Sequence, residues 1–117
     1  MSKVTLYHNP RCSKSRKALE LLEGAGADLE IVAYIDAPPV RATLERLAEL
    51  VGGDAIALVR TGDAAYKDAG APLSGDAGAA EVVAFLDEHP ALMQRPIVAV
   101  GDRAVIARPP ELALDLL

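Results

Sequence analysis

The chain has 117 residues, of which 51% are hydrophobic and 25% are charged, and its formal net charge is −5. This length suits one domain with one core, and the acidic balance argues against nucleic-acid binding, which favours basic surfaces. No apolar run approaches the about 20 residues that a membrane helix needs, and the N-terminal segment lacks a signal-peptide pattern. We therefore expect a cytoplasmic protein with neither a nucleic-acid nor a membrane partner.

Eight segments carry the periodicity of a strand or a helix. In chain order we expect a strand over 3–8, a helix over 13–24, a strand over 29–35, a helix over 40–51, a helix over 81–89, strands over 96–100 and 103–107, and a helix over 109–117. Residues 54–80 predict short helical turns and loops. Gly101 and Asp102 predict a two-residue hairpin turn between the last two strands.

The apolar positions of three expected helices predict which faces are buried. In the helix over 81–89 this face is formed by Val82, Val83, Phe85 and Leu86. Ala18, Leu22 and Ala25 share one stripe of the first helix, and apolar residues recur at helical spacing from Val40 to Val51 in the second. Gly52 and Gly53 are the expected stop signals of that second helix.

The order of these elements predicts the fold class. A β-α-β unit followed by a β-β-α unit is the layout of an α/β protein with a thioredoxin-like fold and a mixed sheet. We expect the segment between the two halves to be a helical insertion. Since no linker, internal repeat or low-complexity tract is visible, residues 1–117 are expected to form a single thioredoxin-like domain.

The only cysteine, Cys12, stands at the expected start of the first helix. Unpaired N–H groups and the helix dipole at such a position favour a thiolate over a thiol. Four basic residues lie close to it in sequence: Arg11, Lys14, Arg16 and Lys17. We expect Arg11, Lys14 and Arg16 to attract the thiolate. We also expect His8, which ends the preceding strand, to help stabilise the thiolate.

Cys12 and Ser15 form a Cys-x-x-Ser motif, which places the serine one helical turn after the thiol. The Ser15 hydroxyl is therefore expected to donate to the thiolate. Because the chain has no second cysteine, it can form no internal disulfide, and a covalent adduct on Cys12 needs a thiol from another molecule for its release. Two isolated histidines, His8 and His89, and one cysteine do not predict a metal site.

Four stretches resemble the ArsC-type, glutaredoxin-dependent arsenate reductase family, in the family's order and over almost the whole chain. They are YHNPRCSKSRKALELL, ALVRTGDAAYK, MQRPIVAV and ARPPELALDLL. The resemblance is to a compact subgroup of that family. It implies a thioredoxin-like fold with a helical insertion, and an oxidoreductase of arsenical resistance that reduces arsenate to arsenite.

The resemblance also implies roles for individual residues. Cys12 would be the nucleophile that attacks arsenate, and His8, Ser15 and Arg16 match residues that tune its thiolate. Arg60, Arg95 and Arg108 match three oxyanion-binding arginines, and Pro96 matches the cis-proline of thioredoxin-like folds. Arginine suits this role because its planar fork binds tetrahedral dianions through paired oxygens and stays charged. Glutathione and glutaredoxin would be the reductants, with no metal and no bound cofactor.

Three other interpretations remain open from the residues. Cys12 could be an inert residue in a solvated helix start. The Cys-x-x-Ser motif also fits a monothiol glutaredoxin-like thiol-disulfide oxidoreductase. Stress regulators of the same fold bind RNA polymerase, although those use a Cys-x-x-Cys redox switch that this chain lacks.

Overall fold

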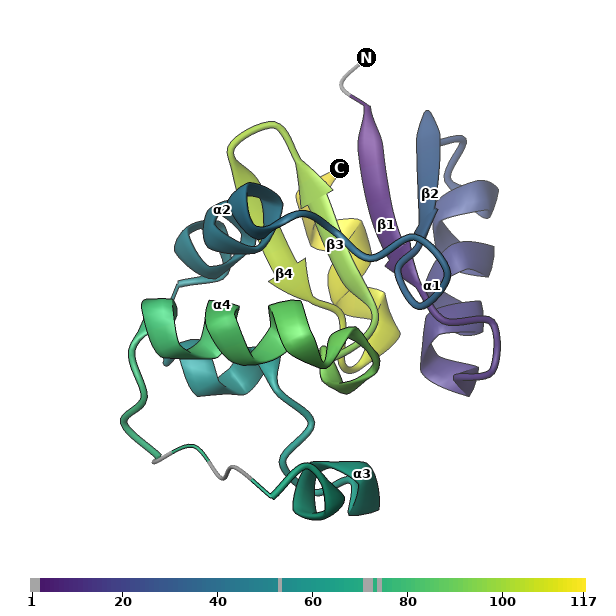
Figure 1. The fold of residues 1–117 in the computed structure, drawn as a ribbon. Coiled ribbons are helices and arrows are strands. Elements are labelled where there is room, and N and C mark those ends of the chain that lie inside the picture. The colour runs from purple at the N-terminus through teal and green to yellow at the C-terminus, as the bar shows by residue number, and fades with distance from the viewer. Residues whose placement is uncertain (1–2, 53, 71–72, 74) are drawn as a thin grey trace. The chain divides into compact units, whose positions relative to one another are not determined.

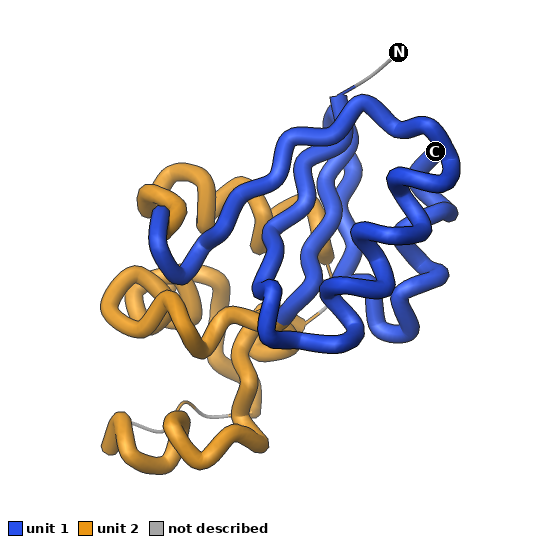
Figure 2. The backbone as a smooth tube through the Cα atoms, turned by 90° about the vertical axis from the view of Figure 1, so that its right-hand side faces the viewer, with its two compact units in different colours: residues 1–37, 95–117 blue, residues 38–94 orange. Residues whose placement is uncertain are grey.

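The computed structural model describes residues 3–52, 54–70, 73 and 75–117. The chain divides into two compact units, which Figure 2 shows in different colours. Unit 1 contains residues 1–37 and 95–117, and unit 2 contains residues 38–94. The second unit is therefore an insertion between the two halves of the first, as the order of the elements predicts.

Unit 1 contains all four strands of one mixed sheet. Its elements are β1 (Val4–His8), α1 (Ser13–Gly24), β2 (Leu29–Ala33), β3 (Ile97–Val100), β4 (Arg103–Ile106) and the 3₁₀ helix η3 (Pro110–Leu116). The strand order is β2-β1-β3-β4, so β1 and β3 are the central strands (Figure 1). β1 pairs in parallel with β2 and antiparallel with β3, and β3 pairs antiparallel with β4. This is the β-α-β and β-β-α layout predicted for a thioredoxin-like fold.

One face of this sheet is covered by α1 and η3, which also pack against each other. Val4 and Leu6 of β1 and Val98 of β3 lie in the same apolar cluster as Ala18 and Leu22 of α1. Ala113 and Leu116 supply the contribution of η3. The cluster holds α1 rigidly on the sheet, so the start of the helix is fixed directly after the end of β1.

Unit 2 is helical. Its elements are α2 (Arg41–Val51), the 3₁₀ helix η1 (Ala55–Leu58), α3 (Ala64–Asp68), α4 (Ala79–Glu88) and the 3₁₀ helix η2 (Pro90–Leu92). α2 and α4 pack together, and each buries the apolar face that its sequence predicts, Leu44, Leu47 and Ala48 in α2 and Val82, Val83, Phe85 and Leu86 in α4. An isolated antiparallel bridge joins Val59 to Met93.

The predicted boundaries are confirmed for α1 and differ elsewhere by a few residues. The strand expected to reach Ile35 ends at Ala33, because the Ala33 carbonyl accepts from the N–H groups of Asp36 and Ala37 and turns the chain. The segment expected as the last helix forms the 3₁₀ helix η3. Gly101 has a φ of 59°, which suits the predicted hairpin turn.

Two predicted core positions are wrong. Ala25 is exposed because it is the C-cap residue beyond the last turn of α1. Val40 is 67% exposed because it is the extended N-cap residue of α2 and lies outside the helical stripe. Gly52 ends α2 with a φ of 69°, as expected, whereas Gly53 lies outside the described residues.

Among the described residues, no helix has the length and hydropathy required to span a membrane. The cytoplasmic location stays a prediction, as does the assignment of residues 1–117 to a single domain.

Candidate active site

Cys12 lies between β1 and α1 in unit 1. It is the N-cap residue of α1, with extended backbone angles of φ −93° and ψ 122°, and its carbonyl accepts the N–H of Arg16 at 3.0 Å. Its own N–H donates to the carbonyl of Asn9 at 3.0 Å, which closes a tight turn after the strand. The thiol is half-buried. The sulfur is therefore placed beside the unpaired N–H groups of the first helical turn, as predicted.

The pKa of the Cys12 thiol is lowered from its ordinary value. Partial burial opposes ionisation, but the backbone N–H of Ser15, the guanidinium of Arg95 and the backbone N–H of Lys14 outweigh it. Arg95 acts both as a hydrogen-bond donor and as a positive charge. Although the thiol completes no regular capping hydrogen bond, these groups stabilise the anion that forms when the proton leaves. The predicted preference for thiolate is therefore borne out in direction.

The cations that surround Cys12 in sequence are not the source of this effect. The side chains of Arg11, Lys14 and Arg16 are exposed, and none is among the groups that lower the pKa of the Cys12 thiol. Arg16 donates instead from Nη1 to the carbonyl of Pro10 at 2.8 Å. The attraction of these three side chains for the thiolate stays a prediction, while the cation that lowers the pKa of the Cys12 thiol is Arg95.

Ser15 is fully buried, and its hydroxyl does not have the predicted role. Ser15 Oγ lies 2.6 Å from His8 Nδ1 and accepts the N–H of Asn9 at 3.0 Å. These two contacts connect the end of β1 to the first turn of α1. Ser15 thus acts on the sulfur through its backbone N–H, and its side chain holds the loop that carries Cys12.

His8 is buried at the end of β1. Burial, together with the positive charge of Arg16, lowers the pKa of His8. His8 Nδ1 and Ser15 Oγ form one hydrogen bond, and which of the two donates depends on the tautomer of the imidazole. His8 is absent from the groups that change the pKa of Cys12. Its expected assistance to the thiolate stays a prediction, and the contact that the structure gives the His8 side chain is the one with Ser15.

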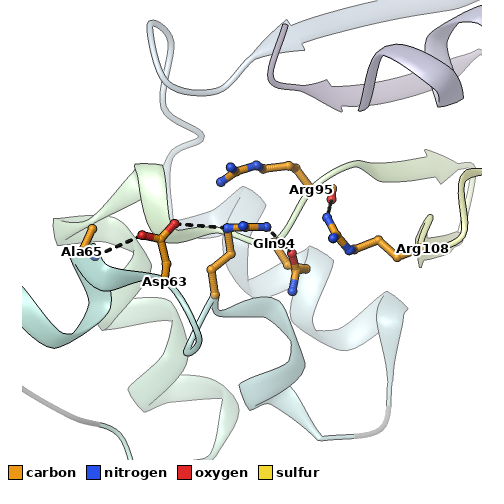
Figure 3. A network of polar contacts seen from close by, with 6 residues as sticks. Asp63, Ala65, Gln94, Arg95 and Arg108 are labelled. Atoms are coloured by element: carbon orange, nitrogen blue, oxygen red, sulfur yellow. Dashed lines mark hydrogen bonds and ion pairs between the residues drawn. The ribbon is translucent and has the colours of Figure 1, made fainter. Parts of the chain in front are cut away.

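Arg95 and Arg108 lie in loops of unit 1, two residues before β3 and two residues after β4 respectively. Each precedes a proline through a cis peptide bond, Arg95–Pro96 and Arg108–Pro109. Arg108 donates from Nη1 to the main-chain carbonyl of Arg95 at 2.9 Å (Figure 3). The structure therefore brings the Arg95 guanidinium to the thiol and the Arg108 guanidinium to the backbone of Arg95.

Arg60 belongs to unit 2, directly after the bridge between Val59 and Met93. It donates from Nη1 to Gln94 Oε1 at 2.9 Å and from Nε to Asp63 Oδ2 at 3.4 Å (Figure 3). The Arg60 side chain is 23% exposed, and that of Asp63 is 31% exposed. Arg60 is thus a partly buried cation that is oriented by an amide and a carboxylate.

Sequence reasoning missed three residues at these positions. One of them is Asn9, which is buried and shapes the loop before Cys12. Its N–H donates to Ser15 Oγ, its carbonyl accepts the N–H of Cys12, and its Oδ1 accepts the N–H of Arg11 at 3.0 Å. An asparagine before a proline is a loop signal that could have identified it. Asp63 and Gln94 were missed because their link to Arg60 needs the pairing of two distant segments. Among the described residues, no group of three or more potential metal ligands occurs.

Comparisons with known proteins point to one family. Residues 7–116 match the model of the ArsC family. An arsenate reductase of Haemophilus influenzae is 41% identical over 97% of this chain and 98% of its own length, and the uncharacterised protein YfgD of Escherichia coli is 41% identical over 97% and 96%. The solved arsenate reductase of Vibrio cholerae superposes with a TM-score of 0.86 and 36% identity, covering 99% of this chain and 98% of that one.

Proposed function

The chain belongs to the ArsC family, and from this premise we propose that it is an arsenate reductase that depends on glutathione and glutaredoxin. The observation that carries the proposal is the half-buried Cys12 whose thiolate is stabilised by two backbone N–H groups and by Arg95. A cationic donor beside a nucleophilic sulfur suits an attack on a negatively charged oxyanion, which the thiolate alone would repel.

In the proposed first step, the Cys12 thiolate attacks the arsenic atom of arsenate. A sulfur–arsenic bond forms, and one arsenate oxygen leaves as water after taking up protons. Arg95 and Arg108 of unit 1 are proposed to bind the arsenate oxygens, with Arg60 of unit 2 as a third oxyanion-binding arginine. Arg95 is proposed to act first on the thiolate and then on the oxyanion, because its guanidinium already faces Cys12.

The need for a thiol from another molecule follows from the thiol count. Reduction of pentavalent to trivalent arsenic takes two electrons, which two thiols supply when they form one disulfide. The chain has one cysteine, so the second thiol must come from another molecule. Glutathione is proposed to attack the adduct, which releases arsenite and leaves a disulfide between Cys12 and glutathione. Glutaredoxin is proposed to reduce that disulfide, and the cycle uses no metal and no bound cofactor.

The proposal is tested by following NADPH oxidation with glutathione reductase, glutathione and glutaredoxin, together with direct measurement of arsenite. We expect arsenite formation that requires both arsenate and Cys12, and none with Cys12→Ser. Thioredoxin and thioredoxin reductase in place of the glutathione components should support no turnover.

Two results would contradict the proposal. Arsenate-independent reduction of glutathione mixed disulfides, with no arsenite formed, would favour the monothiol glutaredoxin-like interpretation. Absence of both activities, with retention of RNA polymerase subunits by wild type and Cys12→Ser alike, would favour the regulatory interpretation.

A further inference from the structure

Arg60 is held in place by a backbone pairing that does not involve its side chain. The Arg60 N–H donates to the Leu92 carbonyl at 2.8 Å, and the Gln94 N–H donates to the Leu58 carbonyl at 2.6 Å. Together with the bridge between Val59 and Met93, these bonds align two short extended segments. They set the Arg60 and Gln94 side chains next to each other, so that Gln94 Oε1 accepts from Nη1 at 2.9 Å.

Asp63 is fixed beside Arg60 independently of their ion pair. Its N–H donates to the Arg60 carbonyl at 3.1 Å, which closes a turn, and its Oδ1 accepts the Ala65 N–H at 3.0 Å as the N-cap of α3. The second carboxylate oxygen, Oδ2, faces Arg60 Nε at 3.4 Å. The negative charge of Asp63 therefore stays near Arg60 whether or not the two side chains are in contact.

These contacts affect how Arg60 can bind an anion. A guanidinium offers two edges for bidentate binding, one formed by Nε and Nη2 and the other by Nη1 and Nη2. Gln94 uses Nη1 of the second edge, and Asp63 uses Nε of the first. The contact with Gln94 is short and electrically neutral, whereas the contact with Asp63 is long. The first edge is therefore the one that an oxyanion can take, at the expense of Asp63.

We propose that Asp63 is an internal competitor for the tetrahedral dianion that Arg60 binds. Its carboxylate occupies the Nε side of Arg60 while no anion is bound, and its fixed negative charge weakens the binding of the dianion that replaces it. Asp63 thereby orients Arg60 before the anion binds and limits anion affinity, which favours release. This inference rests on the oxyanion-binding role of Arg60 in the proposed function.

The test uses sulfate, an unreactive tetrahedral dianion, at constant ionic strength maintained with chloride. Sulfate is titrated into the protein while the Nε–H resonance of Arg60, assigned by its loss in Arg60→Lys, is followed by NMR. Asp63→Asn removes the charge but retains an oxygen for the α3 cap, because asparagine caps helices as well as aspartate does. Asp63→Ser is a second uncharged capping variant. Asp68→Asn, an exposed position of the same helix, is the matched control for net charge.

We expect both Asp63 variants to bind sulfate about threefold more tightly than wild type, the change that a partly exposed ion pair supports. Asp68→Asn should change the affinity less than either. Equal affinity in the Asp63 and Asp68 variants would overturn the inference. Weaker binding in the Asp63 variants would also overturn it, since Asp63 would then prepare Arg60 for the anion rather than compete with it.

A sulfate titration that leaves the Arg60 resonance unchanged in every variant would overturn the inference as well. Arsenate turnover by the wild-type protein is measured separately. If turnover is absent but the Asp63 variants bind sulfate more tightly, the proposed reaction fails while the competition between Asp63 and the anion stands. If turnover occurs and the sulfate affinities do not differ, only the role of Asp63 fails.

Discussion

Arg108 donates from Nη1 to the main-chain carbonyl of Arg95 at 2.9 Å, and Arg95 in turn stabilises the Cys12 thiolate. Arg108 thus holds the backbone of the residue whose guanidinium faces the sulfur. Arg108→Gln should loosen Arg95 and raise the pKa of Cys12, which is measured as the pH midpoint of Cys12 alkylation. Arg103→Gln removes the same charge at an exposed position of β4 and is the control. Equal midpoints in the two variants would contradict this link.

The Ser15 side chain should affect stability far more than thiol reactivity. In Ser15→Ala, His8 Nδ1 and the Asn9 N–H lose their partner in a buried place, which should lower the free energy of unfolding by about 1–3 kcal/mol. The pH midpoint of Cys12 alkylation should stay close to that of wild type, because alanine retains the backbone N–H at position 15. Denaturant unfolding and alkylation rates measure the two effects, with Ser13→Ala at an exposed position of α1 as control. A raised midpoint with unchanged stability would restore the predicted contact between the hydroxyl and the thiolate.

Acidification should destabilise the protein through His8. The pKa of His8 is lowered in the folded state by burial and by Arg16, so the unfolded chain binds more protons between that pKa and the ordinary value near 6.5. The free energy of unfolding therefore falls as the pH decreases through 6.5 and levels off below the folded pKa. His8→Gln should reduce this dependence, and His89→Gln should preserve it. A wild-type stability that does not change with pH across this window would contradict the account.

Cys12 should give a second pH dependence, on the alkaline side. Its pKa is lowered in the folded state, so between that pKa and the ordinary thiol value the unfolded chain again binds more protons. The free energy of unfolding of wild type should therefore rise with pH relative to Cys12→Ser across this range. Reversible denaturation of both proteins at several pH values, with a reducing agent present, measures the difference. A difference that is constant with pH would show that folding does not stabilise the thiolate.

Local sequence patterns correctly predict α1, the helix that begins directly after Cys12. The bounds of α1 and the place of Cys12 at its start are both readable in sequence, because apolar spacing and the Asn-Pro break are properties of adjacent residues. The same holds for the hairpin at Gly101 and for the buried face of α4. The lowered pKa of Cys12 is predictable in part, because two of the stabilising groups, the N–H groups of Lys14 and Ser15, belong to the helix start.

The partners of the charged groups could not be predicted in this way. Arg11, Lys14 and Arg16 are close to Cys12 in sequence, yet the cation that acts on the sulfur is Arg95, which reaches it only because β3 pairs with β1. Proximity along the chain says little about where a long, flexible side chain ends. Ser15 illustrates the same limit. Its position one turn after Cys12 predicts a hydrogen bond from the hydroxyl to the sulfur, but in the structure the hydroxyl bonds instead to His8 Nδ1 and the Asn9 N–H.

The most direct test of the account is the rate of Cys12 alkylation by iodoacetamide as a function of pH, with and without arsenate. We predict a midpoint below that of an ordinary cysteine thiol, a higher midpoint in Arg95→Gln, and slower alkylation of wild type when arsenate is present. An ordinary midpoint that Arg95→Gln does not change, with no protection by arsenate, would contradict both the stabilised thiolate and its proposed use.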